Sequence, residues 1–581
     1  MSLPSSNQGK HQISIAEKTN HEQVTQQFDL DPADVAAHAP SLRGRKLAAA
    51  AAFVAGTGFT LFGYDQGIMS SLITGNQFEA MFPQVVVDAS HSNHATLQSF
   101  IIAIYEVGCL FGALSNLWVG DKLGRRRTIV TGGSIMIVGA ILQTTSFSFA
   151  QLTVARIVTG YGNGLITSTV PTYHAELSPS AKRGRMIMME GTLIVAGVTI
   201  AYVYELLLLF SFSLTGFFVN WSSAQWRVPI ALQLVFEIIM VTCIGFSPRD
   251  GEFRSLRSLS AQPDQRLRLM KQGRNAEAMA IISAMEDKDP SDPDVQRTYY
   301  GIREAVAVET SSQGMRELIT GGRSQNLRRT TIAVVLMMMQ QLTGINLVTF
   351  YATILFQRLG LSDVNARITA AANGTEYFFA SFIAYYAIDY VGRRQLMLIG
   401  AVGQCIVMML LGILGYINNG PAQIVSVVLL FAFNTFFSIG WLGVAWLYPA
   451  EISGLRTRAP TNALSTASNW TFNFVVVMII GPAFNNISWR TYIVFAVMNA
   501  VIVPVVYFFF PETGGRSLED LDVVFALAYN TGQDPVKVSL RKDVPLAGSL
   551  EADVILGVST GVQYYSPRTP SSFSAGAETP A

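Results

Sequence analysis

The sequence is built from repeated apolar stretches of the length that a helix needs to cross a lipid bilayer. The hydrocarbon core of a membrane is about 30 Å thick, so a spanning helix needs roughly 20 mainly apolar residues. Backbone polar groups in lipid must be satisfied within their own segment, which favours helices. We therefore expect an all-α membrane protein. The twelve stretches lie at about 47–68, 97–119, 128–146, 150–171, 187–209, 228–246, 331–356, 368–388, 395–416, 424–447, 462–483 and 491–510.

The charge content supports this interpretation and excludes other classes. Only 14% of the 581 residues are charged, against about 25% in a typical soluble domain. The 40 Lys and Arg balance 39 Asp and Glu, which excludes a strongly basic nucleic-acid binder. Cys109, Cys243 and Cys405 all lie in apolar runs, which argues against disulfides and cysteine metal sites. No nucleophile, metal cluster or acid–base pair stands out, so we expect neither an enzyme nor a cofactor.

Positive charge alternates between the connecting segments and predicts the orientation. Loops rich in Lys and Arg stay on the cytoplasmic side, whereas residues 73–95 contain neither. Both termini are therefore expected in the cytoplasm. The polar first forty residues show no signal peptide. The basic residues that carry this prediction are Arg43, Arg45, Lys46, Lys122, Arg125, Arg126, Arg127, Lys182, Arg183, Arg185, Arg393, Arg394, Arg456 and Arg458.

The spans and the polar segments between them predict five regions. Within the central segment, residues 274–286 have the apolar spacing of a helix. The C-terminal segment becomes rich in Ser, Pro and Gly, which is typical of disorder. We expect a disordered N-terminal tail (1–46), a six-helix half (47–246), cytoplasmic linker helices (247–330), a second six-helix half (331–510) and a largely disordered C-terminal tail (511–581).

Two motifs occur twice and indicate an internal duplication. GDKLGRRR ends at Arg127, and its weaker copy DYVGRR ends at Arg394. YHAELSPSAKRGR begins at Tyr173, and YPAEISGLRTRA begins 275 residues later at Tyr448. Each pair follows equivalent spans, the second and eighth or the fourth and tenth. Two pseudo-symmetric halves of six helices are expected, with a substrate site between them near the midplane of the membrane.

Together these motifs resemble the sugar-porter branch of the major facilitator superfamily from about residue 47 to 530. Further matches are GYDQG (63–67), QQLTGIN (340–346) and PETGGRSLEDLD (511–522). ITGNQF (73–78), YEVGCLFGA (105–113) and GRSQNLRR (322–329) resemble a fungal group that includes glycerol/proton symporters. The resemblance implies the major facilitator fold and uptake of a sugar or polyol by proton symport, in a monomer at the plasma membrane. A facilitative uniporter and a non-transporting nutrient sensor are the alternatives.

Two ionisable residues within the spans are candidates for proton coupling. A charge at the membrane centre costs about 2.5 to 3.5 kcal/mol on insertion scales and therefore usually has a task. Asp65 lies in the first span and Arg156 in the fourth. By resemblance, Asp65 accepts the proton and Arg156 modulates it; the alternative is a static salt bridge. Glu106 and Glu237 also lie in apolar spans and are secondary candidates for a proton relay.

Amide and aromatic side chains are the candidates for substrate binding. By resemblance, Gln340, Gln341 and Asn346 contact the sugar and Trp446 stacks on its ring. Asn469 and Asn473 lie four residues apart and share a helix face. Hydrogen bonding between helices is the alternative role of these amides.

Two positions differ from the sugar-porter pattern. Glu190 or Gly191 replaces a frequent Gln of the fifth span, and Tyr377 replaces a frequent Asn of the eighth. The pocket is therefore expected to differ in shape, which weakens the case for glucose as the substrate.

Charged residues at the cytoplasmic ends of the helices resemble the family's salt-bridge latch, which holds the outward-facing state. Solvated loop charge is the alternative, because isolated surface pairs contribute only about 0 to 1 kcal/mol. The first copy comprises Asp121, Arg125, Arg126, Glu176 and Arg183, and the second comprises Asp389, Arg393, Glu451 and Arg456.

Two stretches, residues 203–216 and 250–268, interrupt the family pattern. We interpret them as translated retained introns, a hypothesis that transcript reads across the gene would test. Uninterrupted read coverage through both stretches would contradict it.

Overall fold

The computed structural model describes ten segments of the chain. Every regular element in them is helical. The chain forms two compact units, one of residues 1–50 and 247–311 and the other of residues 51–246 and 312–581. The described segments are 31–37, 43–87, 93–177, 183–210, 222–245, 275–296, 298–300, 314–454, 457–547 and 549–557.

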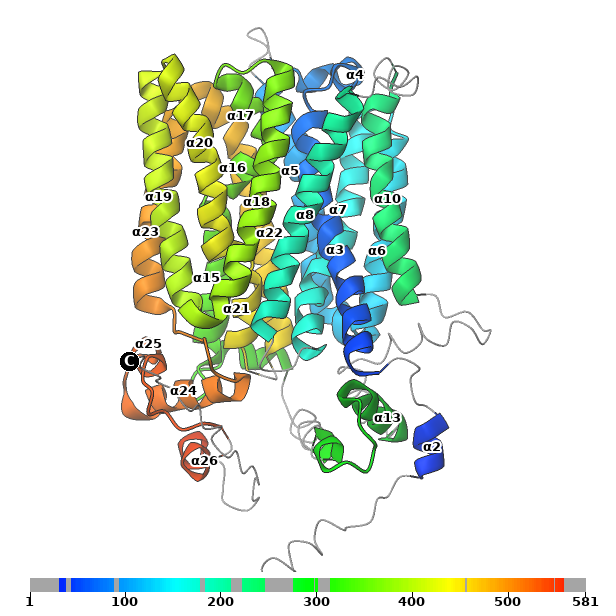
Figure 1. The fold of residues 1–581 in the computed structure, drawn as a ribbon, viewed down its shortest axis with the longest axis vertical. Coiled ribbons are helices and arrows are strands. Elements are labelled where there is room, and N and C mark those ends of the chain that lie inside the picture. The colour runs from blue at the N-terminus through cyan, green and yellow to red at the C-terminus, as the bar shows by residue number, and fades with distance from the viewer. Residues whose placement is uncertain are drawn as a thin grey trace, which may run out of the picture. The chain divides into compact units, whose positions relative to one another are not determined.

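Each of the twelve predicted spans corresponds to a long helical segment, which confirms the predicted fold class (Figure 1). Eight of the segments are long and apolar enough by composition alone to cross a membrane, within the described residues. The first six are α3 (Gly44–Leu72), α5 (His94–Leu123), α6 (Arg125–Thr144), α7 (Phe149–Leu177), α8 (Arg183–Phe210) and α10 (Ala224–Gly245). The second six are α15 to α17 (Asn326–Leu342, Ile345–Phe350, Ala352–Arg358), α18 (Asp363–Val391), α19 (Arg393–Ile417), α20 with η6 and α21 (Gly420–Phe437, Ser438–Leu442, Val444–Ile452), α22 (Arg458–Asn486) and α23 (Arg490–Phe509).

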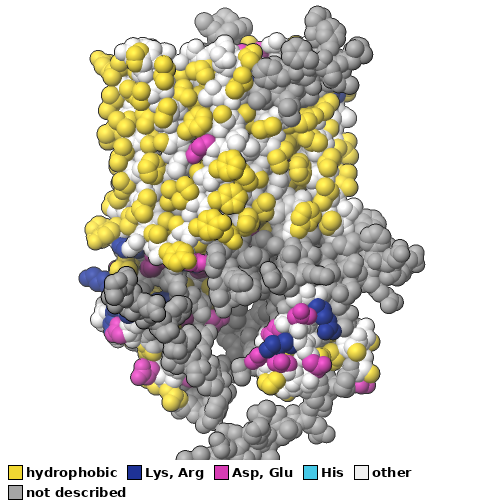
Figure 2. Space-filling model, in the orientation of Figure 1, with side chains coloured by type: hydrophobic (Ala, Val, Ile, Leu, Met, Phe, Trp, Pro, Cys, Tyr) yellow, Lys and Arg dark blue, Asp and Glu magenta, His cyan; other side chains and the backbone are white. Residues whose placement is uncertain are grey.

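The flank of the helix bundle is covered by apolar side chains. Figure 2 shows hydrophobic atoms spread over most of this surface. Phe379 on α18 and Ile424 and Val428 on α20 are more than half exposed. A soluble protein rarely exposes so extensive an apolar patch. This surface therefore fits the hydrocarbon of a bilayer.

Glycines bring the helices of the first half into close contact. Gly108 and Gly112 on α5 and Gly160 and Gly164 on α7 are each spaced four residues apart, and each faces the backbone of the other helix. A Cβ atom at Gly160 would overlap the carbonyl oxygen of Tyr105. Small residues at this spacing let membrane helices approach closely. The pair α5–α7 therefore forms a closely packed support for the side chains between its members.

Two spans of the second half are interrupted. Gly344 has φ +93° and separates α15 from α16, a backbone conformation that favours glycine. Gly344 therefore interrupts the seventh span. In the tenth span, η6 is a π-helical turn between α20 and α21. Such turns frequently occur at functional sites.

The chain after the last span is folded over much of its length. Three short helices follow α23, namely α24 (Leu518–Thr531), α25 (Pro535–Ser539) and α26 (Leu550–Leu556). Ser517 and Asp520 form a capping box at the start of α24. Val523, Val524, Val538 and Ala552 bury a small apolar core. The expectation of a largely disordered tail from 511 is therefore wrong as far as Gly557, because this segment buries its own apolar side chains.

The smaller unit confirms one expected helix and corrects another expectation. The helix α13 (Asn275–Glu286) coincides with the predicted segment 274–286. Val35 on α2 (Pro32–Ala37) is buried with Ile282 and Tyr299, so the N-terminal segment is not disordered throughout. The remaining elements are α4 (Asn76–Met81), η1 (Pro83–Val85) and η5 (Gly314–Ile319).

The two interrupting stretches lie mostly outside the described residues. Residues 203–210 continue α8, whereas 211–216 and 250–268 fall outside.

Candidate functional site

A chain of buried amides runs along the broken seventh span. Asn346 donates a hydrogen bond to Gln341 Oε1 (2.7 Å), and Asn469 on α22 donates one to Gln340 Oε1 (2.7 Å). Gln340 in turn donates to the carbonyl oxygen of Trp441 in the π-helical turn (2.9 Å). These bonds hold the amides in place across three spans. Two of them, between Asn469 and Gln340 and between Gln340 and Trp441, join different spans, which is the alternative role of these amides.

The same amides line a small cavity between the two halves of the bundle. Its volume is about 40 Å³, enough for a few water molecules and too small for a sugar ring. The helices must therefore separate before a sugar enters. The lining residues are Phe62, Gln66, Ile194, Val198, Gln340, Gln341, Ile345, Asn346, Thr349, Tyr377, Phe437, Leu442, Trp446 and Asn469.

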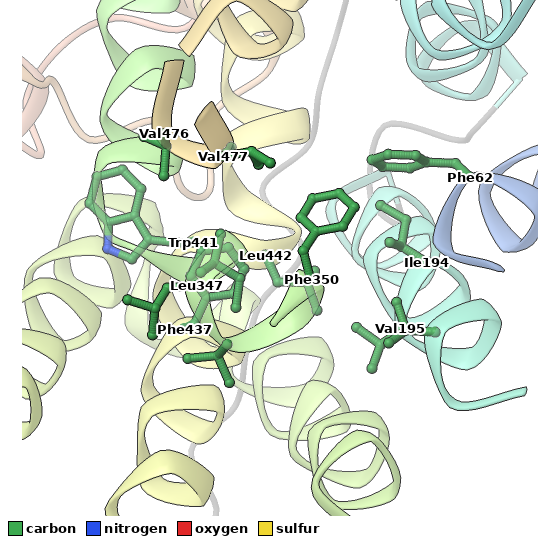
Figure 3. Packing of buried hydrophobic residues seen from close by; sticks show 14 of the residues in the cluster. Phe62, Ile194, Val195, Leu347, Phe350, Phe437, Trp441, Leu442, Val476 and Val477 are labelled. Atoms are coloured by element: carbon green, nitrogen blue, oxygen red, sulfur yellow. The ribbon is translucent and has the colours of Figure 1, made fainter. Parts of the chain in front are cut away.

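Five of the six expected substrate residues line this cavity. Asn473 is the exception; it is buried, and its side-chain amide has no hydrogen-bond partner. Trp446 lines the cavity and meets Phe62 edge to face, with ring centroids 6.2 Å apart. Figure 3 shows Phe62 and Ile194 of the first half on one side and Phe437 and Leu442 of the second half on the other.

Several lining residues were missed in the sequence, and others lie elsewhere than expected. Gln66 follows directly after Asp65 in the GYDQG motif, so its position was a signal that could have been used. Tyr377, which occupies a position where sugar porters often have Asn, lines the cavity. Glu190 and Gly191 do not line it; from α8 the lining residues are the apolar Ile194 and Val198. The wall at the fifth span is therefore apolar.

A second buried cluster surrounds Arg156 on α7. Its Nη2 atom donates to the carbonyl oxygen of Ile102 on α5 (3.1 Å), and its Cζ atom lies 5.1 Å from the centre of the Tyr105 ring. Asp65 is 2% exposed and is a charged neighbour of Arg156. These two described side chains do not form an ion pair within 4.0 Å in this conformation. The expected partners are therefore near one another without direct contact.

Aromatic rings connect the two buried sites. The Tyr105 ring meets Trp470 with centroids 6.3 Å apart, and Trp470 meets Phe62 at 5.2 Å, both edge to face. Phe62 lines the cavity. Contiguous packed rings therefore extend from the Arg156 cluster to the cavity.

Of the residues expected to form the second copy of the latch, Arg393 and Glu451 are paired. Arg393 makes two hydrogen bonds to the carboxylate of Glu451, Nε to Oε2 (3.1 Å) and Nη2 to Oε1 (2.8 Å). Thr513 also donates to Glu451 Oε2 (2.6 Å).

Asp389 is exposed on α18 and contributes to the electrostatic field at Arg393. The first copy's Arg125 and Arg126 are half-buried on α6. Arg456 and the side chains of Asp121, Glu176 and Arg183 lie outside the described part of the structure.

Glu512 contacts the Arg393–Glu451 pair's helix, and the sequence reasoning did not single it out. Its carboxylate accepts hydrogen bonds from the backbone nitrogens of Arg393 (2.9 Å) and Arg394 (3.0 Å) at the start of α19. A negative charge is stabilised at a helix N-terminus. Its position within PETGGRSLEDLD was the available signal.

The sugar (and other) transporter family matches residues 50–525 of the chain. This chain belongs to that family. Sugar transporter STL1 of Saccharomyces cerevisiae is 36% identical over 505 residues, which cover 86% of this chain and 84% of that protein. The MFS-type transporter oryC of Aspergillus oryzae is 36% identical over 475 residues, covering 80% and 83%.

A solved structure shares the fold of this family member. The proton:xylose symporter XylE, bound to 6-bromo-6-deoxy-D-glucose, aligns with a TM-score of 0.68 at 22% identity. The alignment covers 83% of this chain and 99% of that one. The likeness supports the major facilitator arrangement of the twelve helical segments.

Proposed function

We propose that this protein imports a sugar or polyol together with a proton by alternating access. The observation that carries the proposal is the cavity between the two halves, which is lined by hydrogen-bonded amides together with aromatic rings. A polyhydroxylated ligand needs several polar partners beside an apolar wall. Hexoses, pentoses and glycerol all meet this chemistry, and Gln340, Gln341, Asn346, Trp446 and Asn469 are the proposed contacts. Asn473 is proposed to join them in another conformation.

Asp65 and Arg156 are the proposed coupling residues. When they are in contact, Arg156 favours the ionised carboxylate; when they separate, Asp65 holds a proton more readily. The ring contacts from Tyr105 to Phe62 offer a route by which substrate in the cavity changes this separation. A proton crossing about 100 mV gains about 2.3 kcal/mol and one pH unit adds about 1.4 kcal/mol. Together they support roughly a 500-fold substrate gradient.

The latch residues are proposed to stabilise one of the two access states. Arg393, Glu451, Thr513 and Glu512 join α19, α21 and the segment after α23. Opening the cytoplasmic side requires these contacts to break. The contacts of the second copy therefore contribute to the free-energy difference between the two access states. In the first half, the same role is proposed for Asp121, Arg125, Arg126, Glu176 and Arg183.

The proposal includes the setting of the protein. The loop charges support a cytoplasmic location of both termini, and we propose a monomer in the plasma membrane. The names of related proteins, such as the high-affinity glucose transporter 1 of Candida albicans (28% identical), agree with a role in sugar uptake. The family relationship also agrees with transport rather than enzymatic activity.

Uptake of radiolabelled glucose, xylose, glycerol and a disaccharide in transporter-deficient yeast tests the proposal. Accumulation above the outside concentration, its loss on adding an uncoupler and alkalinisation of the medium on adding substrate are the expected results. Asp65→Asn should abolish accumulation while substrate exchange continues. Asp543→Asn, which alters an exposed carboxylate paired with Arg541, is the control and should transport normally.

The other outcomes distinguish the alternatives. Uptake that only equilibrates, without alkalinisation, would identify a facilitative uniporter. No uptake of any substrate by a protein that reaches the membrane would favour a nutrient sensor. Undiminished accumulation by Asp65→Asn would remove that residue from the coupling mechanism.

A further inference from the structure

Glu106 on α5 is a buried carboxyl group for which the proposed transport cycle has no assigned role. Its side chain is fully buried, and neither carboxylate oxygen has a hydrogen-bond partner. A buried ionised carboxylate without partners is strongly unfavourable. Such a group inside a membrane usually has a function.

The helix geometry brings Glu106 to the Arg156 cluster. Ile102, Tyr105 and Cys109 lie three or four residues from each other or from Glu106, so they share one face of α5. Arg156 bonds to the Ile102 carbonyl and covers the Tyr105 ring on this same face. The glycine contacts between α5 and α7 keep this spacing fixed.

Ionisable groups on three helices surround Glu106. Asp65 comes from α3 and Arg156 from α7, and both act electrostatically on Glu106. Tyr105 and Cys109 lie beside it on α5. The helix α22 packs against α5 and carries no acidic or basic residue after Arg458, and α6 carries none after Arg127.

The charge balance of the cluster favours bound protons. Glu237 on α10 is also fully buried, neither of its carboxylate oxygens has a hydrogen-bond partner, and Asp65 is its charged neighbour. Among the described residues, Arg156 is the cation that acts on Asp65 and Glu106, and Asp65 in turn acts on Glu237. Ionisation of all three carboxyl groups would leave two uncompensated negative charges in a medium of low dielectric constant. One carboxylate can balance Arg156, and burial disfavours the charged form of the other two carboxyl groups.

We propose that Glu106 is a second proton-carrying carboxyl of the coupling site and exchanges a proton with Asp65 beside Arg156. This inference rests on the proposed symport. In one arrangement Glu106 is protonated and Asp65 is ionised; in the other the proton has moved from Glu106 to Asp65, and the total charge is unchanged. Because the two carboxyl groups share one proton, Asp65 can move when substrate binds without leaving an uncompensated charge at the site.

Glu106→Gln tests the role in transport, because glutamine keeps the size of the side chain and cannot exchange a proton. We expect the midpoint of the pH dependence of uptake to move to lower pH by about one unit, because a neighbouring carboxylate no longer helps Asp65 to bind its proton. Substrate exchange should continue. Glu106→Asp should restore a pH dependence close to that of the unmodified protein, whereas a purely structural role would lower the maximal rate and leave the midpoint in place.

Glu376→Gln is the matched control in the other half of the bundle. The Glu376 carboxylate accepts a hydrogen bond from Thr435 (2.6 Å), and a glutamine amide oxygen can accept the same bond. The pH dependence of uptake by this variant should be unchanged. A shift of the same size in both variants would show a general effect of removing intramembrane carboxyl groups and would overturn the proposal.

Infrared difference spectroscopy on the purified protein in lipid nanodiscs tests the proton itself without transport. A carbonyl band of a protonated carboxyl should titrate with pH and disappear in Glu106→Gln. Absence of any Glu106-dependent band would overturn the proposal even if the protein is a symporter. If the unmodified protein does not alkalinise the medium, the symport fails and the coupling role of Glu106 fails with it, whether or not the band is present.

Discussion

Arg393 and Glu451 form a buried two-point ion pair between the start of α19 and the end of α21. The two hydrogen bonds are 3.1 and 2.8 Å long, and both side chains are less than one tenth exposed. The planar guanidinium matches the two carboxylate oxygens, which makes this geometry stronger and more specific than a single contact. Removing one partner would leave the other charge buried without compensation.

Glu451→Gln should therefore destabilise the protein by about 3 kcal/mol or more, because a buried ion pair is broken. The measurement is the melting temperature of the purified protein in detergent, which should fall by several degrees. Glu519→Gln, at an exposed position on α24, is the control and should change stability by less than about 0.5 kcal/mol. Equal melting temperatures for Glu451→Gln and the unmodified protein would contradict the structural role of this pair.

A second prediction concerns the segment after the last span. Arg329 is 2% exposed, forms an ion pair with Asp522 and lies over the Phe525 ring at 4.1 Å. Asp522→Asn should lower the melting temperature, because it removes the negative charge beside a buried cation. Asp534→Asn is the control. It removes the charged partner of Arg328 in an ion pair whose two side chains are partly exposed, so it should change the melting temperature little. If the two variants have the same melting temperature, α24 does not anchor the start of α15 in the way that the contacts indicate.

The course of the chain through the membrane could be predicted because its cause is local. A run of about 20 apolar residues is sufficient to define a spanning helix, so all twelve segments were found. The break at Gly344 also has a local cause, since glycine between two amide-bearing turns permits the positive φ that the structure has.

Other features depend on contacts between distant residues. The fold of residues 518–556 rests on a small core that the Ser, Pro and Gly content of the tail concealed. Asn469 and Asn473 share a helix face, yet only Asn469 reaches the cavity, because periodicity gives the face and not the depth. The role of Glu512 depends on Arg393 and Arg394, more than 100 residues away.

Gly160 tests the close contact between α5 and α7. In Gly160→Ala the new methyl group would overlap the backbone oxygen of Tyr105, and overpacking of this kind typically costs about 1 to 3 kcal/mol. Gly420→Ala is the control, because nothing lies within 4 Å of a Cβ atom at that position. The melting temperature should fall in the first variant and stay nearly constant in the second. A stable Gly160→Ala protein would show that the two helices are free to move apart.

Gln340 tests the amide chain as a binding site. Gln340→Ala removes a group that bonds to both Asn469 and Trp441. Loss of a hydrogen bond to a polar ligand costs about 1 to 1.5 kcal/mol, so KM for uptake should rise by about tenfold at similar expression. Asn473→Ala is the companion variant, because Asn473 is buried outside the cavity lining. An equal rise in KM in both variants would indicate that Asn473 contacts the substrate in another conformation.

Tyr377 tests the control of substrate size. Its ring lines the cavity and packs against Phe437 with centroids 6.3 Å apart, at a position where sugar porters often have the smaller Asn. Tyr377→Asn should enlarge the cavity and add an amide. The ratio of kcat/KM for glucose to kcat/KM for glycerol should therefore increase, because a hexose needs the additional space. Competition between the two labelled substrates in transporter-deficient yeast measures this ratio directly. Tyr386→Asn, on the exposed face of the same helix, should leave it unchanged, and an unchanged ratio in Tyr377→Asn would mean that this ring does not limit the size of the substrate.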